Sequence, residues 1–379
     1  MPSGTVRVTP ERFVAGGAAL GHAPDGRVVF VRGAVPGDDV TAEIVEDKAA
    51  FVQATVVAVH AGGPDRVVPP CPQRRIGCGG CDWQHVNPAA QLAHKVTVVA
   101  DALRRTAKLP DAAVRAGASV PAEGYRTTVR VVGDEHGRPA FRQERSHATV
   151  PAAGCLIAHP LLRDLLTAPV EAGAEVTVRA SVATGEADAG AALTEHVGGV
   201  PLRVSPGAFF QSGPAAAELL VDAVRRAAPE LALARHVVDA YAGVGLFAAT
   251  VVPPTAKVTA IESSPVAVAD CRANLAGRDP ATVLIVCAEV GRWRPEVGER
   301  YDVVIADPAR TGLAKPGVRA LAQVHAPVFV LVSCDPVALA RDAALLAEHG
   351  YRHDGTEVLD LFPHTHHVEA VTRFVRTAD

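Results

Sequence analysis

Two residues near the C-terminus carry the side chains that covalent catalysis needs. Cys334 stands between the strand-forming run VFVLVS and the helix-like segment DPVALARD, so its thiol is expected at the end of a strand. Glu369 belongs to the last predicted strand and follows His364, His366 and His367. A thiolate nucleophile and a carboxylate base in one active site can form and then resolve a covalent intermediate. The three histidines are interpreted as structural residues or substrate contacts, without a preference between the two.

A glycine turn between a strand and a helix predicts a cofactor site. In VVDAYAGVGLFA, Gly243 and Gly245 let the backbone pass close to a ligand, although the pattern is not the GxGxxG of nicotinamide enzymes. Glu262 ends the next strand about 20 residues later, where a carboxylate would bond ribose hydroxyls. Asp307 follows a further strand in ADPAR, and an Asp-Pro at that position resembles class I methyltransferases more than dehydrogenases. These strand ends favour S-adenosylmethionine.

A thiol near the methyl donor limits which atom can be the acceptor of the methyl group. Most enzymes that use S-adenosylmethionine methylate nitrogen or oxygen and need no thiol. Carbon 5 of uracil becomes nucleophilic only after a nucleophile adds at carbon 6, and a thiolate suits that addition. A base must then remove the hydrogen from carbon 5. Cys334 and Glu369 fit these two roles, whereas a methyltransferase with another acceptor would leave Cys334 silent.

A second group of cysteines predicts a metal site. The segment CPQRRIGCGGCDWQH places three cysteines within eleven residues, and one further cysteine follows in AAGCLIAHP. The predicted ligands are Cys71, Cys78, Cys81 and Cys155. Four thiolates suit either tetrahedral zinc or an iron–sulfur cluster, and the spacing does not choose between them.

The elements that would position these side chains fall into three predicted domains. Residues 1–62 contain short strands separated by Gly, Pro and Asp turns, the pattern of a small β-barrel. The linker AGGPDRVVPP leads into a central α+β domain, residues 63–200, with the cysteines, a helix over 88–109 and arginine-rich strands. Over 201–379 helices alternate with strands, which predicts a parallel, doubly wound α/β sheet. The last two strands, TEVLDLFP and VEAVTRFVR, are expected to pair antiparallel at its edge.

Composition and charge limit the class of protein. The chain of 379 residues is 49% hydrophobic and 21% charged, which predicts a globular protein rather than a disordered one. The N-terminus lacks an apolar core of signal-peptide length and no apolar run could span a membrane, so we expect a cytoplasmic protein without a membrane partner. In that compartment an odd number of cysteines favours metal ligands or reactive thiols over disulfides. Cys271 and Cys287 lie in apolar segments and are expected to be small buried side chains.

The motifs FFQ, DAYAGVG, DPARTG, SCDP and HVE stand in the order found in the RNA uridine-C5 methyltransferases of 23S rRNA and tRNA, and the chain resembles that family over nearly its whole length. The N-terminal strands resemble a TRAM domain, an OB-like RNA-binding barrel. CGGC with its flanking cysteines resembles the 4Fe-4S site of the family. The resemblance therefore implies a Rossmann-like class I methyltransferase domain over 201–379, and a 4Fe-4S cluster with zinc as the alternative.

The same resemblance assigns roles to individual residues. It implies Cys334 as the nucleophile, Glu369 as the proton acceptor, and contacts to S-adenosylmethionine from Gln211, Tyr241, Glu262 and Asp307. It also implies an RNA substrate, with rRNA favoured over tRNA. Separately, we expect a monomer. An inward-pointing Asp335 would raise the pKa of the neighbouring thiol, but we expect it to cap the helix that begins at Pro336.

Charge places the predicted RNA contacts in the centre of the chain. Residues 1–60 carry five Lys and Arg against seven Asp and Glu, whereas residues 66–163 carry 14 against seven. The predicted phosphate contacts are Arg104, Arg105, Lys108, Arg126, Arg130, Arg142 and Arg145, with Trp83, Tyr125 and Phe141 as stacking surfaces. The remaining alternative is an RNA-binding protein that has this fold but little or no catalytic activity.

Overall fold

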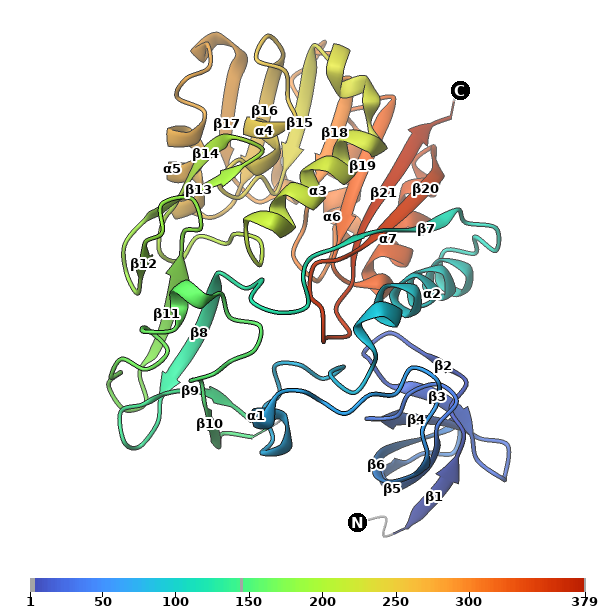
Figure 1. Cartoon of the computed structure of the whole chain (residues 1–379). Coiled ribbons are helices and arrows are strands. Elements are labelled where there is room, and N and C mark those ends of the chain that lie inside the picture. The colour runs from blue at the N-terminus through green and yellow to red at the C-terminus, as the bar shows by residue number, and fades with distance from the viewer. Residues whose placement is uncertain (1–3, 144–145, 378–379) are drawn as a thin grey trace.

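The computed structural model describes residues 4–143 and 146–377. Its N-terminal strands pair in the order β1-β5-β6-β4-β3-β2 and form a curled sheet, drawn in blue in Figure 1. The strands are β1 (Thr5–Val8), β2 (Arg12–Phe13), β3 (Ala19–His22), β4 (Val28–Arg32), β5 (Asp39–Asp47) and β6 (Phe51–Ala61). Alternate residues of β4 point inward, so Val29 and Val31 are buried with Phe13 in one core. The predicted OB-like barrel thus takes the form of a curled sheet with β1 and β2 at its edges.

The central part of the chain combines helices with an antiparallel sheet. Its helices are α1 (Pro72–Arg75), α2 (Pro88–Thr106) and the short 3-10 helix η1 (Pro160–Leu162), and α2 confirms the helix predicted over 88–109. The antiparallel sheet has the order β10-β9-β8-β11-β12. Its strands are β8 (Thr128–Gly133), β9 (Pro139–Arg142), β10 (Thr149–Pro151), β11 (Glu175–Ala180) and β12 (Ala187–Asp188). A hairpin of β13 (Leu193–Val197) and β14 (Val200–Val204) follows.

The C-terminal sheet has the order β17-β16-β15-β18-β19-β21-β20-β7. Its strands are β15 (His236–Ala240), β16 (Lys257–Glu262), β17 (Val283–Cys287), β18 (Val303–Ala306), β19 (Val328–Ser333), β20 (Tyr351–Asp360), β21 (Glu369–Arg376) and β7 (Val114–Ser119). The first five strands in that order run parallel, as predicted, because helices connect them. β21 is antiparallel to both β19 and β20.

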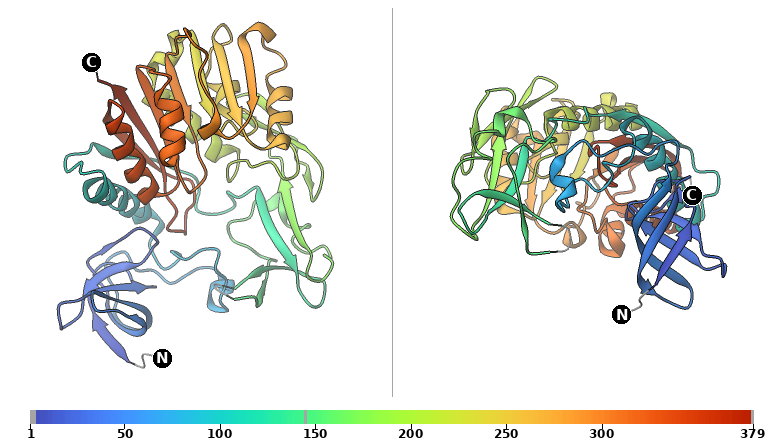
Figure 2. Two further views of the ribbon diagram at one scale, coloured as in Figure 1. Left: turned by 180° about the vertical axis from the view of Figure 1, so that it is seen from behind. Right: turned by 60° about the horizontal axis from the view of Figure 1, so that its bottom comes forward.

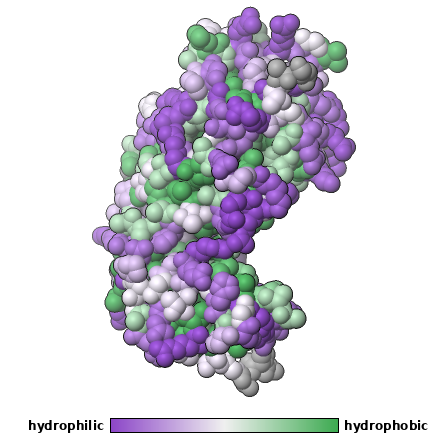
Figure 3. All heavy atoms as spheres, turned by 90° about the vertical axis from the view of Figure 1, so that its right-hand side faces the viewer, coloured by the Kyte–Doolittle hydropathy of each residue, from purple (hydrophilic) through white to green (hydrophobic). Residues whose placement is uncertain are grey.

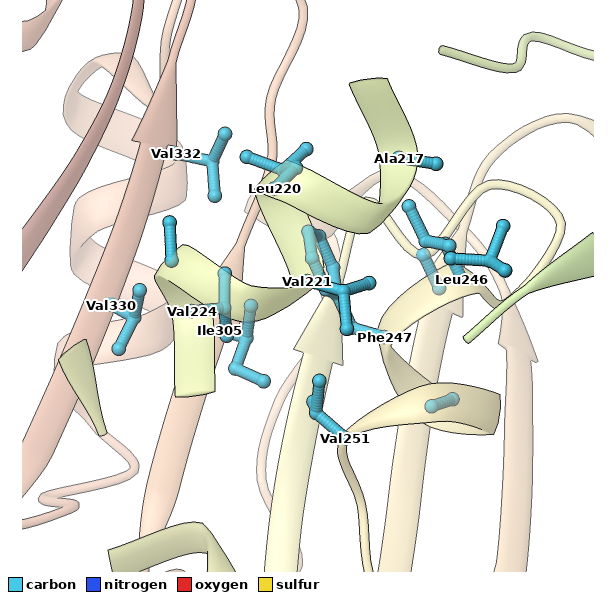
Figure 4. Packing of buried hydrophobic residues seen from close by; sticks show 14 of the residues in the cluster. Ala217, Leu220, Val221, Val224, Leu246, Phe247, Val251, Ile305, Val330 and Val332 are labelled. Carbon is cyan, nitrogen blue, oxygen red and sulfur yellow. The ribbon is translucent and has the colours of Figure 1, made fainter. Parts of the chain in front are cut away.

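Helices cover both faces of this sheet, so its inner strands β15, β16, β18 and β19 are largely apolar and buried. The helices are α3 (Pro214–Ala227), α4 (Leu246–Thr250), α5 (Pro265–Asn274), α6 (Ala314–Ala322) and α7 (Pro336–Glu348), with the 3-10 helices η2 (Pro229–Leu233), η3 (Pro280–Thr282) and η4 (Val290–Arg292). Figure 4 shows Leu220 and Val224 of α3 next to Ile305 and Val330 of the sheet. Seen from behind, α6 and α7 cover the opposite face (Figure 2).

Two features cross the predicted domain boundaries. Strand β7, from the segment predicted as the central domain, pairs parallel to β20 and forms the edge of the C-terminal sheet. The two C-terminal strands therefore lie one position inside the edge where the sequence placed them. The β13–β14 hairpin spans the predicted boundary at residue 200. The domain boundaries at residues 62 and 200 remain predictions.

The surface in Figure 3 is hydrophilic over much of the face shown, with hydrophobic residues in small scattered patches. Within the described ranges, none of the helices has both the length and the apolar composition that a membrane span requires.

Candidate active site

The carboxyl ends of adjacent parallel strands bring the predicted cofactor residues together. Ala240 of β15 pairs with Ile261 of β16 and with Ala306 of β18. The residue after each of these positions is therefore at the same edge: Tyr241, Glu262 and Asp307. This edge is where open α/β sheets bind their ligands.

The glycine turn after β15 is held by the carboxylate of Glu262. Its Oε2 accepts a hydrogen bond from the Gly243 amide (3.0 Å), and its Oε1 accepts one from the Ser264 amide (2.7 Å). Gly243 has φ 55° and a Cβ there would meet no atom within 4 Å, so its backbone borders open space. A Cβ on Gly245 would come within 3.0 Å of the Cys271 sulfur, so that glycine is needed for packing. The turn fits a ligand that approaches the backbone at Gly243, as S-adenosylmethionine would.

Gln211 reaches the same edge from the loop before α3. Its Nε2 lies 3.4 Å from Oδ2 of Asp307 and donates to it, which links the FFQ and DPARTG motifs. Burial raises the pKa of Asp307 to about 7. Burial also raises the pKa of Tyr241 to about 12, and its hydroxyl points toward Gly317 of α6. The five predicted cofactor residues thus come together at one edge of the sheet.

Cys334 and Glu369 face each other on neighbouring antiparallel strands. Ser333 of β19 pairs with Ala370 of β21, and continuing that register by one residue sets Cys334 opposite Glu369. Burial, and then the negative charges of Glu369 and Asp307, raise the pKa of the Cys334 thiol to about 11, while Arg310 opposes the rise. Burial and the nearby Asp307 raise the pKa of Glu369 well above its usual value. The predicted nucleophile and base are therefore neighbours at the end of the sheet.

Asp335 caps α7, as the sequence predicted. Its Oδ1 accepts hydrogen bonds from the amides of Val337 (2.9 Å) and Ala338 (2.8 Å). The carboxylate next to Cys334 is therefore directed at the helix N-terminus.

The three histidines before Glu369 make contacts inside the protein. His364 is buried; its amide donates to Oε1 of Gln91 (2.7 Å), and its carbonyl accepts from the Trp83 amide (2.8 Å). The ring of His366 lies 2.5 Å from Oδ2 of Asp82. His367 contacts Arg310. Sequence reasoning missed Asp82, Gln91 and Arg310; of these, Arg310 belongs to the DPARTG motif and Asp82 directly follows the CxxC pair, whereas Gln91 had no signal.

The predicted metal ligands line one cavity of about 500 Å³. These residues are Cys71, Cys78, Cys81 and Cys155, which come from the α1 segment and from the turn after β10. Burial, and then the neighbouring Cys155, raise the pKa of Cys81 to about 12. In the described parts of the chain, no three His, Cys, Asp or Glu side chains are grouped closely enough for a single metal ion. The shared cavity and its four thiols do fit the donor set of an iron–sulfur cluster.

One of the two cysteines predicted as buried is exposed. Cys271 of α5 is fully buried, which confirms the prediction. The prediction for Cys287 is wrong: this residue is exposed because it ends β17, the other edge strand of the sheet.

The residues predicted to contact RNA phosphates form two groups in the described structure, one at the cysteine cavity and one on or just after α2. Arg126, Arg130 and Arg142 line the cysteine cavity together with Phe141. The remaining residues that the structure describes lie on or just after α2: Arg104 and Arg105 pair with Asp101, and Lys108 donates to the Arg105 carbonyl. Arg145 lies outside the described residues.

Two of the aromatic residues predicted to stack on RNA are buried instead. Trp83 is 1% exposed and packs on Phe13, with ring centroids 4.2 Å apart. Tyr125 is 7% exposed and donates its hydroxyl to the Pro363 carbonyl. These two predictions are wrong, because both side chains fill contacts between segments that are distant in the sequence.

Comparison with known proteins places this geometry in a family. Residues 4–57 match the TRAM domain model. The chain is 35% identical to an uncharacterised RNA methyltransferase of Streptomyces coelicolor, over 94% of this chain and 89% of the relative. It is 32% identical to the 23S rRNA (uracil(1939)-C(5))-methyltransferase RlmD of Chromohalobacter salexigens, over 97% of this chain and 88% of that protein.

Its fold is similar to that of the Pyrococcus abyssi tRNA (uracil-54, C5)-methyltransferase solved with S-adenosyl-L-homocysteine. The TM-score is 0.75 at 22% identity, over 97% of this chain and 99% of the other. Together, the relatives, the TRAM match and the fold show that the chain belongs to the uracil-C5 family of RNA methyltransferases, enzymes that depend on S-adenosylmethionine.

Proposed function

We propose that this enzyme methylates carbon 5 of a uridine in structured RNA through a covalent adduct with Cys334, and that ribosomal RNA is its substrate rather than tRNA. The observation that carries the proposal is the placement of Cys334 opposite Glu369, at the edge where Asp307 and Glu262 lie. The RlmD relatives are 23S rRNA (uracil(1939)-C(5))-methyltransferases, which supports the choice of substrate.

The first step uses the sulfur of Cys334. The thiol transfers its proton to water, its sulfur forms a bond to carbon 6 of uracil, and the electrons of the 5,6 double bond move toward carbon 5 and oxygen 4. Because burial raises the pKa of this thiol to about 11, the free enzyme keeps it protonated at neutral pH. The positive charge of Arg310 favours the thiolate and so makes the addition easier.

The residues at the carboxyl edge of the sheet would hold the methyl donor. Glu262 and the Gly243 backbone suit the ribose end, and Gln211, Tyr241 and Asp307 would complete the site. Oε2 of Glu262 accepts one backbone hydrogen bond and retains a lone pair for a ribose hydroxyl, whereas Oε1 accepts from both the Ser264 amide and the Ser263 hydroxyl. S-adenosylmethionine, when bound, supplies the methyl group that carbon 5 takes up.

Glu369 completes the reaction. Its carboxylate removes the proton from carbon 5, the double bond re-forms, and the carbon 6–sulfur bond breaks with its electron pair returning to Cys334. The raised pKa of Glu369 suits this role, because a more basic carboxylate takes up a proton more readily.

We also propose that Cys71, Cys78, Cys81 and Cys155 hold a 4Fe-4S cluster, with zinc as the alternative. The cavity that these thiols share supports the proposal. Protein purified without oxygen should be brown and contain iron and acid-labile sulfide, and Cys78→Ser should lose both. Colourless protein with stoichiometric zinc would decide for the alternative.

The test of the proposed reaction uses methyl-labelled S-adenosylmethionine, unmodified total RNA, and Cys334→Ala beside the unaltered enzyme. After digestion to nucleosides, label is expected in 5-methyluridine and is expected to disappear in the variant. Fractionating the RNA by size then identifies the substrate. Label in a different nucleoside, or an active Cys334→Ala enzyme, would contradict the proposal. RNA binding without any label would favour the inactive RNA-binding protein.

A further inference from the structure

A row of side chains connects the cysteine segment with the surroundings of the nucleophile. It begins at Asp82, directly after Cys81. Its Oδ2 lies 2.5 Å from Nδ1 of His366, and its Oδ1 accepts a hydrogen bond from the His366 amide (3.2 Å). The rings of His366 and His367 are in contact, with their centroids 4.4 Å apart and their planes tilted by 51°. The row ends where His367 contacts Arg310.

The contact between Arg310 and His367 has a defined geometry. Nη2 of Arg310 is almost equally far from the two ring nitrogens of His367, at 3.3 Å and 3.4 Å. If Nη2 lay in the plane of the ring at these two distances, it would overlap the ring carbon between the two nitrogens. The guanidinium therefore lies over the face of the ring, where an aromatic system attracts a cation.

The charge state of His367 suits this arrangement. Burial, and then the neighbouring His366 and Arg310, lower the pKa of His367 to about 4. The ring is therefore neutral at neutral pH and does not repel the guanidinium.

Arg310 belongs to the loop that lies beside Cys334. Ala306 of β18 pairs with Leu331 of β19, and the loop with Arg310 follows β18 just as Cys334 follows β19. The backbone of this loop is fixed from α7. Oδ2 of Asp342 accepts from the Leu313 amide (2.6 Å), and Arg341 donates to the Thr311 carbonyl (2.7 Å).

The guanidinium of Arg310 stays in one position only if another side chain contacts it. Arg310 is exposed, and a long exposed side chain loses considerable rotamer entropy when it is held in one position. The face of the His367 ring supplies that contact. Asp82 and His366 fix the ring of His367 in turn.

We propose that His367, fixed by His366 and Asp82, is a positioning residue that holds the guanidinium of Arg310 beside the Cys334 thiol. The inference rests on the proposed role of Cys334 as the nucleophile, and it gives a role to two of the three histidines that the sequence left open. It also means that the segment with the metal-ligating cysteines takes part in arranging the nucleophile.

The test measures the reactivity of Cys334 directly and needs neither RNA nor turnover. The holoenzyme is treated with iodoacetamide under anaerobic conditions at a series of pH values, and alkylation of the Cys334 peptide is followed by mass spectrometry. Arg310→Ala and His367→Ala are each expected to slow alkylation at neutral pH at least about threefold, as loss of a nearby unit charge does even when water screens it. The double variant should be no slower than Arg310→Ala, because both changes remove the same effect.

Two further variants separate positioning from a general structural role. His367→Phe keeps an aromatic face and should alkylate at nearly the rate of the unaltered enzyme. Asp82→Asn should slow alkylation in the same direction as His367→Ala. His325→Ala is the matched control, since His325 also contacts an arginine, Arg376, at the opposite end of the strands. Exposed Cys287 serves as the internal reference for alkylation in every variant.

Each outcome decides the inference. Slower alkylation in His367→Ala, recovery in His367→Phe and no additivity with Arg310→Ala would support it. Unchanged alkylation in folded His367→Ala, or an effect that adds to that of Arg310→Ala, would overturn it. If His367→Ala does not fold, normal alkylation in Asp82→Asn would overturn it instead. Full methyl transfer by Cys334→Ala would refute the proposed function, whereas the alkylation result concerns the positioning of Arg310 alone.

Discussion

At the residue scale, opposing charges around Cys334 determine its reactivity. Burial and the carboxylates of Glu369 and Asp307 hold the proton on sulfur, while Arg310 favours its release. The same burial makes Glu369 a stronger base than an exposed carboxylate. An enzyme that forms an adduct and later resolves it needs both properties, because the thiol must leave and the carboxylate must take a proton.

Replacing Glu369 should therefore separate the two halves of the reaction. Glu369→Gln keeps the size of the side chain but cannot accept the proton from carbon 5. We expect turnover to fall about a hundredfold or more, while a methylated adduct between RNA and Cys334 accumulates. Label from methyl-labelled S-adenosylmethionine should stay with the protein after denaturation.

The control for this prediction is the double variant Cys334→Ala with Glu369→Gln, which should retain no label. Normal turnover in Glu369→Gln would show that another group removes the proton.

At the element scale, the junction between β15 and α4 depends on one buried carboxylate. The residue that caps α4 is Gly245, which has no side chain to offer. Oδ2 of Asp239 accepts from the Ala248 amide (2.8 Å) in its place. Within the described residues Oδ1 of Asp239 has no hydrogen-bond partner, and burial raises the pKa of this carboxyl to about 7. The side chain of Asp239 in β15 thus caps α4, the helix that follows this strand.

Asp239→Asn should change how stability depends on pH. Because the pKa is raised in the folded state, the stability that this group contributes is fully present below about pH 4 and is lost as the pH rises through about 7. Asparagine can still cap the helix but does not ionise. Relative to the unaltered protein, the variant should gain up to roughly 4 kcal/mol between acid and mildly alkaline pH.

Thermal unfolding of both proteins across this pH range measures the difference. Asp270→Asn is a suitable control, because Asp270 is equally buried but bonded to Ser205 and Arg203. A pH-independent difference for Asp239→Asn would show that Asp239 titrates normally.

At the scale of the whole molecule, the segment from Asp82 to Lys95 joins the N-terminal sheet to the C-terminal one. Trp83 packs on Phe13 and donates to the Gly17 carbonyl (3.0 Å). Lys95 of α2 is fully buried and lies 2.6 Å from Oδ1 of Asp360, at the end of β20. The loop before Glu369 therefore rests on contacts from other parts of the chain.

The arginines around the cysteine cavity should bind RNA through its phosphates. Arg126→Glu combined with Arg130→Glu should weaken RNA binding, and the slope of log affinity against log salt should become shallower by roughly 0.7 to 0.9 for each lost phosphate contact. Filter binding at several salt concentrations measures both quantities. Arg352→Glu, at an exposed site on β20, should leave the affinity and the slope unchanged. Unaltered binding by the double variant would move the RNA surface elsewhere.

The sequence alone determined what depends on local pattern. Alternating strands and helices predicted the parallel sheet, and the residues at strand ends indicated Glu262, Asp307 and Cys334, because parallel strands end at a common edge. Asp335 was predicted as a cap from Pro336 and the helix that follows it, which are local features.

Only the tertiary structure decided what depends on contacts between distant segments. β7 joins the far edge of the sheet, Trp83 and Tyr125 are buried, and Cys287 is exposed at an edge strand. The row from Asp82 to Arg310 joins residues that are more than half of the chain apart. No repeat or motif spacing in the sequence predicts these contacts. Such contacts arise when folded elements pack, so patterns of neighbouring residues could indicate Cys334 and Glu369 as candidates but could not indicate the contacts of Asp82, His366 and Arg310.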